Sequence, residues 1–316
     1  MKTNLINGLG VCLSLGLATW GAAQPSRTPS NQANVVTVES QSVPQATNQT
    51  IVQDVRGNRV SIKDYQRIVS VNTVADHLLL QLIEPQRLVG ITHHSLESHP
   101  ESWRFGERSS VQRATDVEHI LALQPDIVII SSFVNESVIA RLHEANVAVF
   151  DLGDTRGFVS LLGDIDALGQ VLNLNTRAAQ LTGRIERELK ALERAVPVEK
   201  RPVGMYLSMY GDSFFGGTTN TSFADMLAYG GIDDLAPKHG YKEWPQYTPE
   251  QLLVMNPALI VTSQGLGAGI CNHTILQQLA ACTQDGKVIE ISSEYISDPG
   301  LGMIQAAASI QAAVHP

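Results

Sequence analysis

Residues 175–196 read NTRAAQLTGRIERELKALERAV and predict one long amphipathic helix. Its apolar side chains recur at helical spacing along a single face, at Ala178, Leu181, Ile185, Leu189, Leu192 and Val196. Asn175 is a good N-cap residue and Pro197 closes the far end. The opposite face carries charged side chains, Arg184 among them, and is expected to face solvent. At 1.5 Å per residue the helix would be roughly 30 Å long, so it can join two lobes stiffly.

Two segments on either side of this helix match each other without a gap. Residues 118–131 read EHILALQPDIVIIS and residues 250–263 read EQLLVMNPALIVTS, an offset of 132 positions from Glu118 to Glu250. Both give a glutamate, an apolar helix face, a proline and a buried strand. A repeat of this length indicates one architecture used twice. The alternative is that both are ordinary helix–proline–strand junctions of an α/β domain.

The remaining chain alternates strands with helices, which predicts an α/β fold with parallel sheets covered on both faces. We predict two Rossmann-like lobes with central parallel sheets, at residues 51–156 and 198–316. A helical connection, residues 157–197, contains the long helix and joins them. A hairpin over 51–62 opens the first lobe. Loops are expected over 92–113 and, rich in glycine, over 210–221.

The amino terminus indicates export. Residues 1–23 have a lysine, a short apolar run and small residues before Gln24, which is typical of a cleaved signal peptide and predicts a periplasmic location. Lipid attachment at Cys12 is the less favoured alternative, because Val11 stands where a small residue is expected. Residues 24–50 are mostly polar and predict a disordered linker.

Composition narrows the partners and the redox state. The net charge of −9 argues against nucleic acid and against an anionic membrane surface. The mature chain would keep two cysteines, Cys271 and Cys282, which can form a disulfide in an oxidising compartment. Closing so short a loop stabilises the fold by about 3 kcal/mol in the chain-entropy description. Their spacing fits no zinc site.

Several motifs together resemble a known family. They are Arg67-Ile-Val-Ser, Leu88-Val-Gly-Ile, Glu118-x-Ile-x-Ala-Leu-x-Pro-Asp, the long helix, and Trp244-Pro-Gln-Tyr-Thr-Pro-Glu. In this order they resemble the periplasmic substrate-binding proteins of iron-siderophore, haem and cobalamin ABC importers, over residues 50–316. The resemblance implies two lobes with the ligand between them. It also implies that Glu118 and Glu250 dock on the permease. The alternative is a glutamate favoured by the dipole at a helix start.

Side chains that follow the strands are the candidates for ligand contact. They are His93, His94, Phe133, Tyr210, Phe215, Trp244 and Tyr295. Most are aromatic and suit a macrocycle or bulky chelate. Trp244 falls where similar cobalamin binders carry a tryptophan, although it could instead cover the core of the second lobe. His93 and His94 would point apart in an extended loop, so the two cannot both bind one small metal ion. Metal ligation by one of them stays open.

Charge favours a near-neutral ligand. No arginine follows Arg201, so the second lobe beyond this residue has no guanidinium to clamp an anionic chelate. We therefore predict a monomeric binder that delivers a ferric siderophore or similar chelate to an ABC permease, with cobalamin or haem as alternatives and no cofactor of its own.

Two other classes of protein are alternatives. Gly211-Asp212-Ser213 resembles the nucleophile block of GDS-type esterases, but Ala312 stands where the aspartate before His315 is expected. A hydrolase is thus disfavoured, and we predict no enzyme. The second class is a cell-surface interaction module, which copurification with a permease would distinguish from a transport protein.

Overall fold

The computed structural model describes residues 50–98 and 102–316. The predicted signal peptide, residues 1–23, and nearly all of the predicted linker lie outside the described residues. Within the described part, contacts group everything from residue 50 onward into one compact unit. No helix in that part is long and apolar enough to cross a bilayer.

The first lobe is built on a five-stranded parallel sheet of order β5-β4-β3-β6-β7. Its strands are β3 (Ile68–Ser70), β4 (Leu88–Thr92), β5 (Ser109–Val111), β6 (Ile127–Ile130) and β7 (Ala148–Asp151). Helices α1 (Thr73–Leu82), α3 (Val117–Ala122) and α4 (Glu136–Glu144) connect them. The first strand lies centrally and later strands add on either side, which is the doubly wound order of a Rossmann-like fold. The predicted hairpin forms from β1 (Ile51–Gln53) and β2 (Arg59–Ser61).

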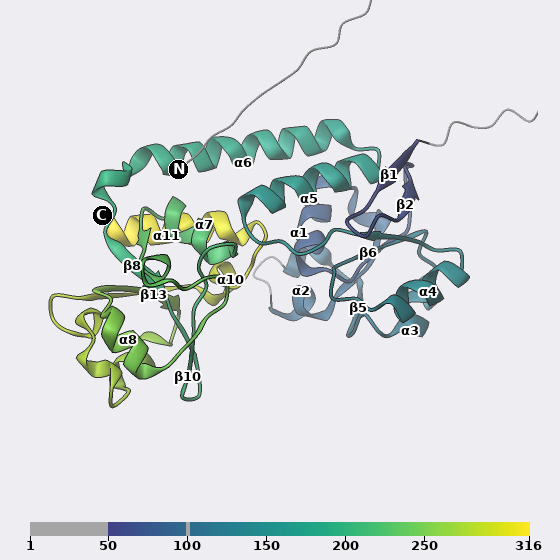
Figure 1. The fold of residues 1–316 in the computed structure, drawn as a ribbon. Coiled ribbons are helices and arrows are strands. Elements are labelled where there is room, and N and C mark those ends of the chain that lie inside the picture. Colours follow the sequence, from purple (N-terminus) through teal and green to yellow (C-terminus); the bar gives the residue numbers. More distant parts are fainter. Residues whose placement is uncertain (1–49, 99–101) are drawn as a thin grey trace, which may run out of the picture. The chain divides into compact units, whose positions relative to one another are not determined.

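The second lobe repeats this order on a smaller scale. Its parallel sheet, β11-β8-β13-β14, has β8 (Val203–Tyr206), β11 (Asp233–Asp234), β13 (Leu259–Ser263) and β14 (Lys287–Ile291). Helices α7 (Ser222–Tyr229), α8 (Pro249–Met255) and α11 (Gly302–Val314) accompany them. The two parallel sheets confirm the predicted fold class (Figure 1).

A small antiparallel sheet, β12-β10-β9, corrects one prediction. It contains β9 (Ser208–Tyr210), β10 (Ser213–Phe215) and β12 (Gln246–Tyr247). The glycine-rich loop expected over 210–221 therefore begins as a hairpin. Gly211, with φ of 57°, provides the left-handed turn that joins the two strands.

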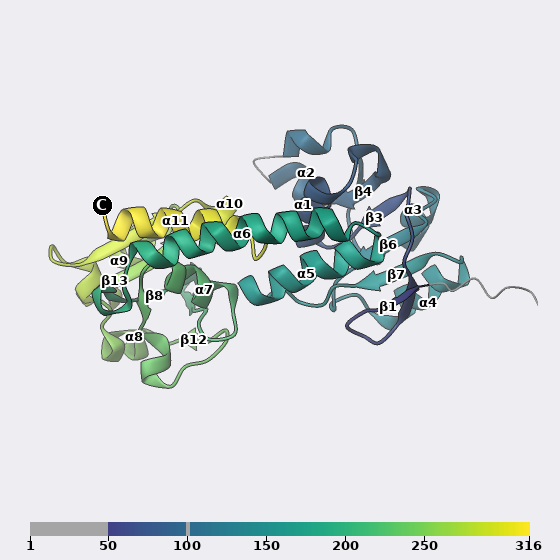
Figure 2. The same ribbon diagram turned by 90° about the horizontal axis from the view of Figure 1, so that it is seen from above.

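The bridging helix α6 spans Asn175–Ala195, 21 residues, and buries four residues of the predicted stripe, Ala178, Leu181, Ile185 and Leu189. It lies beside α5 (Phe158–Val171) in both views (Figures 1 and 2). The two helices approach closely at Gly169, where an added Cβ would lie 2.4 Å from Cβ of Ala178. Asn175 is the first helical residue rather than the predicted N-cap. The N-cap position falls on Leu174, whose side chain makes no capping hydrogen bond.

Apolar packing separates into one shared core and two local ones. The shared core joins α1, α5, α6, α7 and α11 to one face of each parallel sheet. The other face of the first-lobe sheet packs on α3 and α4. The other face of the second-lobe sheet packs on α8 and the small antiparallel sheet. A continuous core through the helices makes the connection between the lobes stiff.

The two matched segments occupy equivalent places in the two lobes. Each helix is capped by the side chain two residues before the matched glutamate, Asp116 for α3 and Thr248 for α8. The residue before each matched proline is left-handed, Gln124 at φ 50° and Asn256 at φ 42°. The strands that follow, β6 and β13, each pair in parallel with the first strand of their sheet. The predicted repeat is therefore confirmed.

Candidate ligand-binding site

The carboxyl ends of β3 and β4 are held together by one buried carboxylate, Asp76 on α1. Its Oδ2 accepts the backbone N–H of Thr92 at 3.1 Å and the Thr92 hydroxyl at 2.6 Å. Burial raises the pKa of Asp76 to about 7, although hydrogen bonds from Ser70, Thr92 and Ser95 oppose that rise. Asp76 thereby holds Thr92, the residue directly before His93 and His94.

That pair lies in a helix rather than in the extended loop expected over 92–113. Helix α2 spans His93–Ser98, and a short turn of 3-10 helix follows at Ser102–Phe105. The helix forms because the Thr92 hydroxyl accepts the N–H of Ser95 at 3.3 Å and caps its first turn.

The two histidines have different surroundings. Nε2 of His93 lies 2.9 Å from Glu97, and its Nδ1 lies 3.2 Å from the Ser110 hydroxyl. His94 is exposed. Adjacent helical residues do not share a face, so the two side chains still diverge. Among the described residues no group of three or more histidine, cysteine, aspartate or glutamate side chains is arranged to hold a metal ion.

Exposed aromatic side chains follow the strands of both lobes. In the first lobe, Phe133 lies between β6 and α4 and is 84% exposed. In the second lobe, Tyr210 is 84% exposed and Phe215 39%. The register pairs Tyr210 with Ser213, two residues before Phe215, so strand alternation places both aromatics on one face of the small sheet. Phe214 points to the buried face.

Trp244 packs on a neighbouring aromatic side chain and is also partly open to solvent. Its ring meets Phe223 edge to face at 5.5 Å between centroids, and Phe223 stacks on Tyr206 at 3.7 Å. Trp244 itself remains 54% exposed. It therefore rests on the core of the second lobe and also offers an open aromatic surface, on a base that cannot shift freely.

Tyr295 lines a cavity that sequence reasoning missed. The cavity has a volume of about 440 Å³ and is lined by His77, Gln81, Arg104, Arg184, Tyr295 and Asp298, with further side chains of α6 and α11. Tyr295 comes from α10 (Ser293–Ile296). The prediction of a near-neutral ligand depends on the scarcity of arginine in the second lobe alone. The fold brings Arg184 from the bridging helix and Arg104 from the first lobe to the same cavity as Tyr295.

The two predicted docking glutamates occupy matching helix starts but differ in their partners. Glu118 forms an ion pair with Arg141 on α4, which holds the pKa of the Glu118 carboxyl below its usual range. Glu250 is exposed, and its pKa is lowered by hydrogen bonding with its own backbone N–H and with Thr248. Neither glutamate belongs to the side chains at the carboxyl ends of the strands that are candidates for ligand contact.

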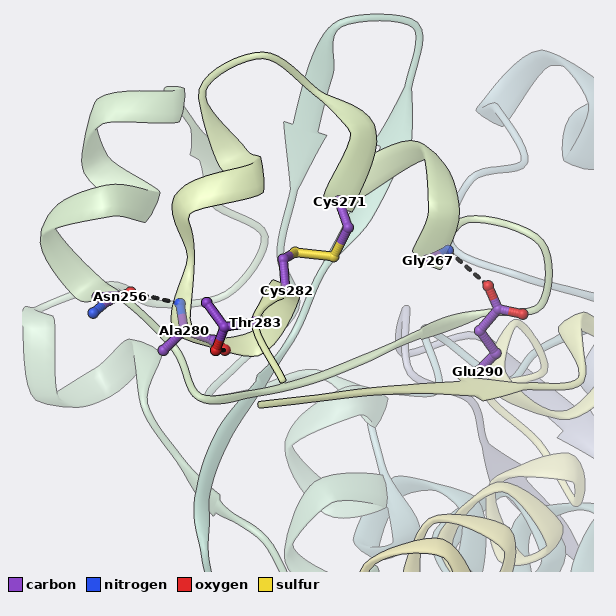
Figure 3. The surroundings of a disulfide bond; sticks show 7 residues. All are labelled: Asn256, Gly267, Cys271, Ala280, Cys282, Thr283 and Glu290. Carbon is purple, nitrogen blue, oxygen red and sulfur yellow. Dashed lines mark hydrogen bonds between the residues drawn. A yellow bond between two sulfur atoms is a disulfide. The ribbon is translucent and has the colours of Figure 1, made fainter. Parts of the chain in front are cut away.

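The predicted disulfide joins Cys271 and Cys282, with their Cα atoms 5.3 Å apart (Figure 3). It closes the segment between β13 and β14, which contains α9 (Gly267–Asn272). Two hydrogen bonds hold the same segment: Ala280 N–H donates to Asn256 at 2.8 Å, and Gly267 N–H donates to Glu290 at 2.7 Å. This part of the second lobe is therefore fixed at three points.

Ser213 and His315, the two residues considered for the hydrolase alternative, lie on different elements of the second lobe. Ser213 lies in β10, on the small sheet. His315 follows α11, where its Nε2 lies 3.1 Å from the carbonyl oxygen of Gly231. No hydrogen bond in the described part of the chain joins the serine to this histidine.

Comparison with known proteins gives the class. The model of a family described as periplasmic binding protein matches residues 68–295, and the chain belongs to that family. Two curated relatives share 21% identity with it. One, a cobalamin-binding protein of Halobacterium salinarum, aligns over 79% of this chain and 69% of its own length. The other, an uncharacterized ABC transporter substrate-binding lipoprotein, YvrC of Bacillus subtilis, aligns over 84% and 85%.

A solved structure shows the same fold. The periplasmic haem-binding protein HutB of Vibrio cholerae has a TM-score of 0.68 and 21% identity, covering 79% of this chain and 99% of its own. The family match and this shared fold make the chain a periplasmic binding protein by class, and the relative from Bacillus subtilis is named as the substrate-binding part of an ABC transporter. These relatives are named as binding proteins rather than as enzymes.

Proposed function

We propose that this protein captures a ferric siderophore or similarly bulky metal chelate and delivers it to an ABC permease. The observation that carries the proposal is the set of exposed aromatic side chains at the strand ends of both lobes, among them Phe133, Tyr210 and Trp244. Exposed aromatic rings at strand ends offer apolar surface that a bound ligand can remove from water. Flat apolar walls suit a macrocycle or a chelate with an apolar rim.

Cobalamin and haem are the alternative ligands in the same class. Cobalamin is favoured by the Trp244-Pro-Gln run and by the name of the relative from Halobacterium salinarum. Haem is favoured by the name of the Vibrio cholerae structure and by His93, whose imidazole is a common axial ligand of iron. Arg104 and Arg184, which line the cavity beside Tyr295, are also suited to carboxylates of either ligand.

The proposal includes the state of the protein in the cell. We infer a monomer, exported by a cleaved signal peptide, that binds and releases its ligand without making or breaking a covalent bond. It needs no cofactor of its own. The net charge of −9 supports a small-molecule ligand over nucleic acid.

Spectral titration tests the ligand class. Purified protein is mixed with haemin, cyanocobalamin and ferric desferrioxamine in turn, and the visible spectrum is followed at each addition. We expect saturable binding of one of the three, with the ligand recovered unchanged after release. Saturable binding of free metal ions or sugars alone would contradict the proposal, and so would chemical conversion of the ligand.

Docking on the permease is tested separately. We propose that Glu118 and Glu250 pair with basic residues of the permease, because they occupy equivalent exposed positions on the two lobes. The double variant Glu118→Arg, Glu250→Arg should lose ligand uptake in cells while its ligand affinity stays unchanged. The matched control reverses two other exposed glutamates, Glu144 and Glu186, and should keep uptake. A loss of ligand affinity in the first variant would instead place these glutamates at the ligand.

A further inference from the structure

Arg56, in the turn of the β1–β2 hairpin, contacts three separate parts of the first lobe. Its Nε donates to Asp151 at the end of β7, and its Nη1 donates to Glu136 at the start of α4. Its Nη2 donates to two backbone carbonyls, those of Ser132 at 2.9 Å and Val134 at 2.8 Å. All three nitrogens of the guanidinium are therefore used, in the planar fork geometry that only arginine offers.

The turn that carries Arg56 is itself rigid. Oδ1 of Asp54 accepts the backbone N–H of Arg56 at 3.0 Å and that of Asn58 at 2.8 Å. Oδ2 of Asp54 accepts the N–H of Asp151 at 3.1 Å, which ties the turn to β7. Gly57, at φ 86°, allows the chain to reverse. The position of Arg56 is thus set before it reaches its partners.

The two carbonyls held by Arg56 belong to the residues on either side of Phe133. One nitrogen, Nη2, fixes both peptide groups, so the backbone between them has little freedom to rotate. Val134 adds a second restraint, because its side chain is only 6% exposed and packs in the core beneath. With its neighbour buried and both flanking carbonyls held, Phe133 has to point outward, where it is 84% exposed.

Electrostatics favours retention of a cation at this position. Asp151 is fully buried, and Arg56 is the cation paired with it in the described part of the chain. An isolated buried carboxylate is strongly disfavoured. Lysine would keep the charge beside Asp151, but its single nitrogen cannot also reach Glu136 and both carbonyls. Charge pairing and loop positioning are therefore separable by substitution.

We propose that Arg56 is a positioning residue of the ligand site, acting through Phe133. It lies on a hairpin outside residues 68–295, the span that the family model matches, so the wall formed by Phe133 depends on an element added before that span. The inference rests on the proposed function in one respect: Phe133 must be one of the surfaces that contact the ligand.

The first experiment needs no ligand. Hydrogen–deuterium exchange of the peptide covering residues 131–137 is compared in wild type, Arg56→Lys and Arg59→Ala. Arg59 is a second arginine of the same hairpin, exposed on β2, and serves as the matched control. We expect faster exchange of this peptide only in Arg56→Lys, with the rest of the lobe unchanged. Unchanged exchange in Arg56→Lys would overturn the proposal, as would equal loosening in Arg59→Ala.

The second experiment measures the consequence for binding. The probe is whichever of haemin, cyanocobalamin or ferric desferrioxamine wild type binds, titrated into Arg56→Lys, Phe133→Ala and the double variant. We expect weaker binding in each single variant, and a double variant no weaker than Phe133→Ala, because residues that act through one another are not additive. Additive losses, or full affinity in Arg56→Lys beside a loss in Phe133→Ala, would overturn the proposal.

The two experiments separate the two hypotheses. If wild type binds none of the three probes while exchange rises in Arg56→Lys, the proposed function fails and the positioning of the loop by Arg56 stands. If a probe binds but exchange and affinity are those of wild type in Arg56→Lys, the proposed function stands and the role assigned to Arg56 is wrong.

Discussion

The two lobes share a framework but fix their loops by different means. Both have a capped helix, a left-handed residue before a proline, and a strand beside the first strand of the sheet. In the first lobe, buried or half-buried charges fix the strand ends, Asp76 under β4 and Arg56 across β6 and β7. In the second lobe, stacked aromatics and a disulfide do most of this, and hydrogen bonds to Asn256 and Glu290 add to the disulfide.

This difference separates what must be repeated from what is free to change. The framework follows from local rules, namely caps, backbone dihedrals and strand alternation, and therefore recurs wherever those residues recur. The loops meet a ligand, and any arrangement that holds them still is sufficient. Charged networks respond to pH, whereas stacked rings and a disulfide do not. We therefore expect a reducing agent to loosen the second lobe, which contains the disulfide, and to leave the first lobe unchanged.

Loss of the disulfide should have the largest effect on stability. The variant Cys271→Ala, Cys282→Ala frees a loop with a sequence separation of 11. We expect the free energy of unfolding to fall by about 3 kcal/mol, because the unfolded chain regains the entropy of the open loop. Denaturant unfolding in oxidising and reducing buffer measures it. Reduced wild type should match the variant, and a variant as stable as oxidised wild type would contradict the expectation.

The pH response of the first lobe comes next. Burial raises the pKa of Asp76 from 3.8 to about 7, so the folded protein keeps a proton that the unfolded chain has lost. Stability from this group is therefore greatest at low pH, falls as the pH rises from about 4 to about 7, and is level above that. Asp76→Asn should remove a slope of up to about 1.4 kcal/mol per pH unit from unfolding curves in this window. Parallel pH profiles for wild type and variant would contradict this account.

The matched left-handed residues should respond to glycine with opposite signs. Gln124 has no side-chain hydrogen bond among those of the described residues, so Gln124→Gly relieves a strained φ of 50° and should stabilise by about 0.5 kcal/mol. Asn256 tolerates φ of 42° and its side chain accepts the N–H of Ala280, so Asn256→Gly should destabilise by about 1 kcal/mol. Chemical denaturation of both variants measures the difference. Equal shifts would show that the positions are equivalent in energy as well as in geometry.

The framework was predictable because its signals are local. Helical spacing gave the buried stripe of α6, and the matched segments gave the equivalence of β6 and β13. Two errors came from short elements. Helix α2 is only six residues long, and its cap depends on Thr92, which the sequence presents as a strand end. The hairpin at Gly211 was missed because its strands are three residues each.

The site was less predictable, because its supporting contacts join residues distant in sequence. Arg56 meets Ser132 and Asp151, separated from it by 76 and 95 positions, and no local pattern marks such a pair. The helical spacing correctly placed Arg184 on the exposed face of α6. Its place in the cavity with Tyr295 follows only from how α6 lies between the lobes.

We propose that one ligand contacts both lobes at once. The most direct measurement compares the affinity of one probe that wild type binds in two single variants, Phe133→Ala in the first lobe and Phe215→Ala in the second. Each ring that packs on the ligand contributes on the order of 1.4 kcal/mol, so each variant should weaken binding about tenfold at unchanged one-to-one stoichiometry. Loss of affinity in only one of the two variants would contradict the claim, because a single lobe would then hold the ligand.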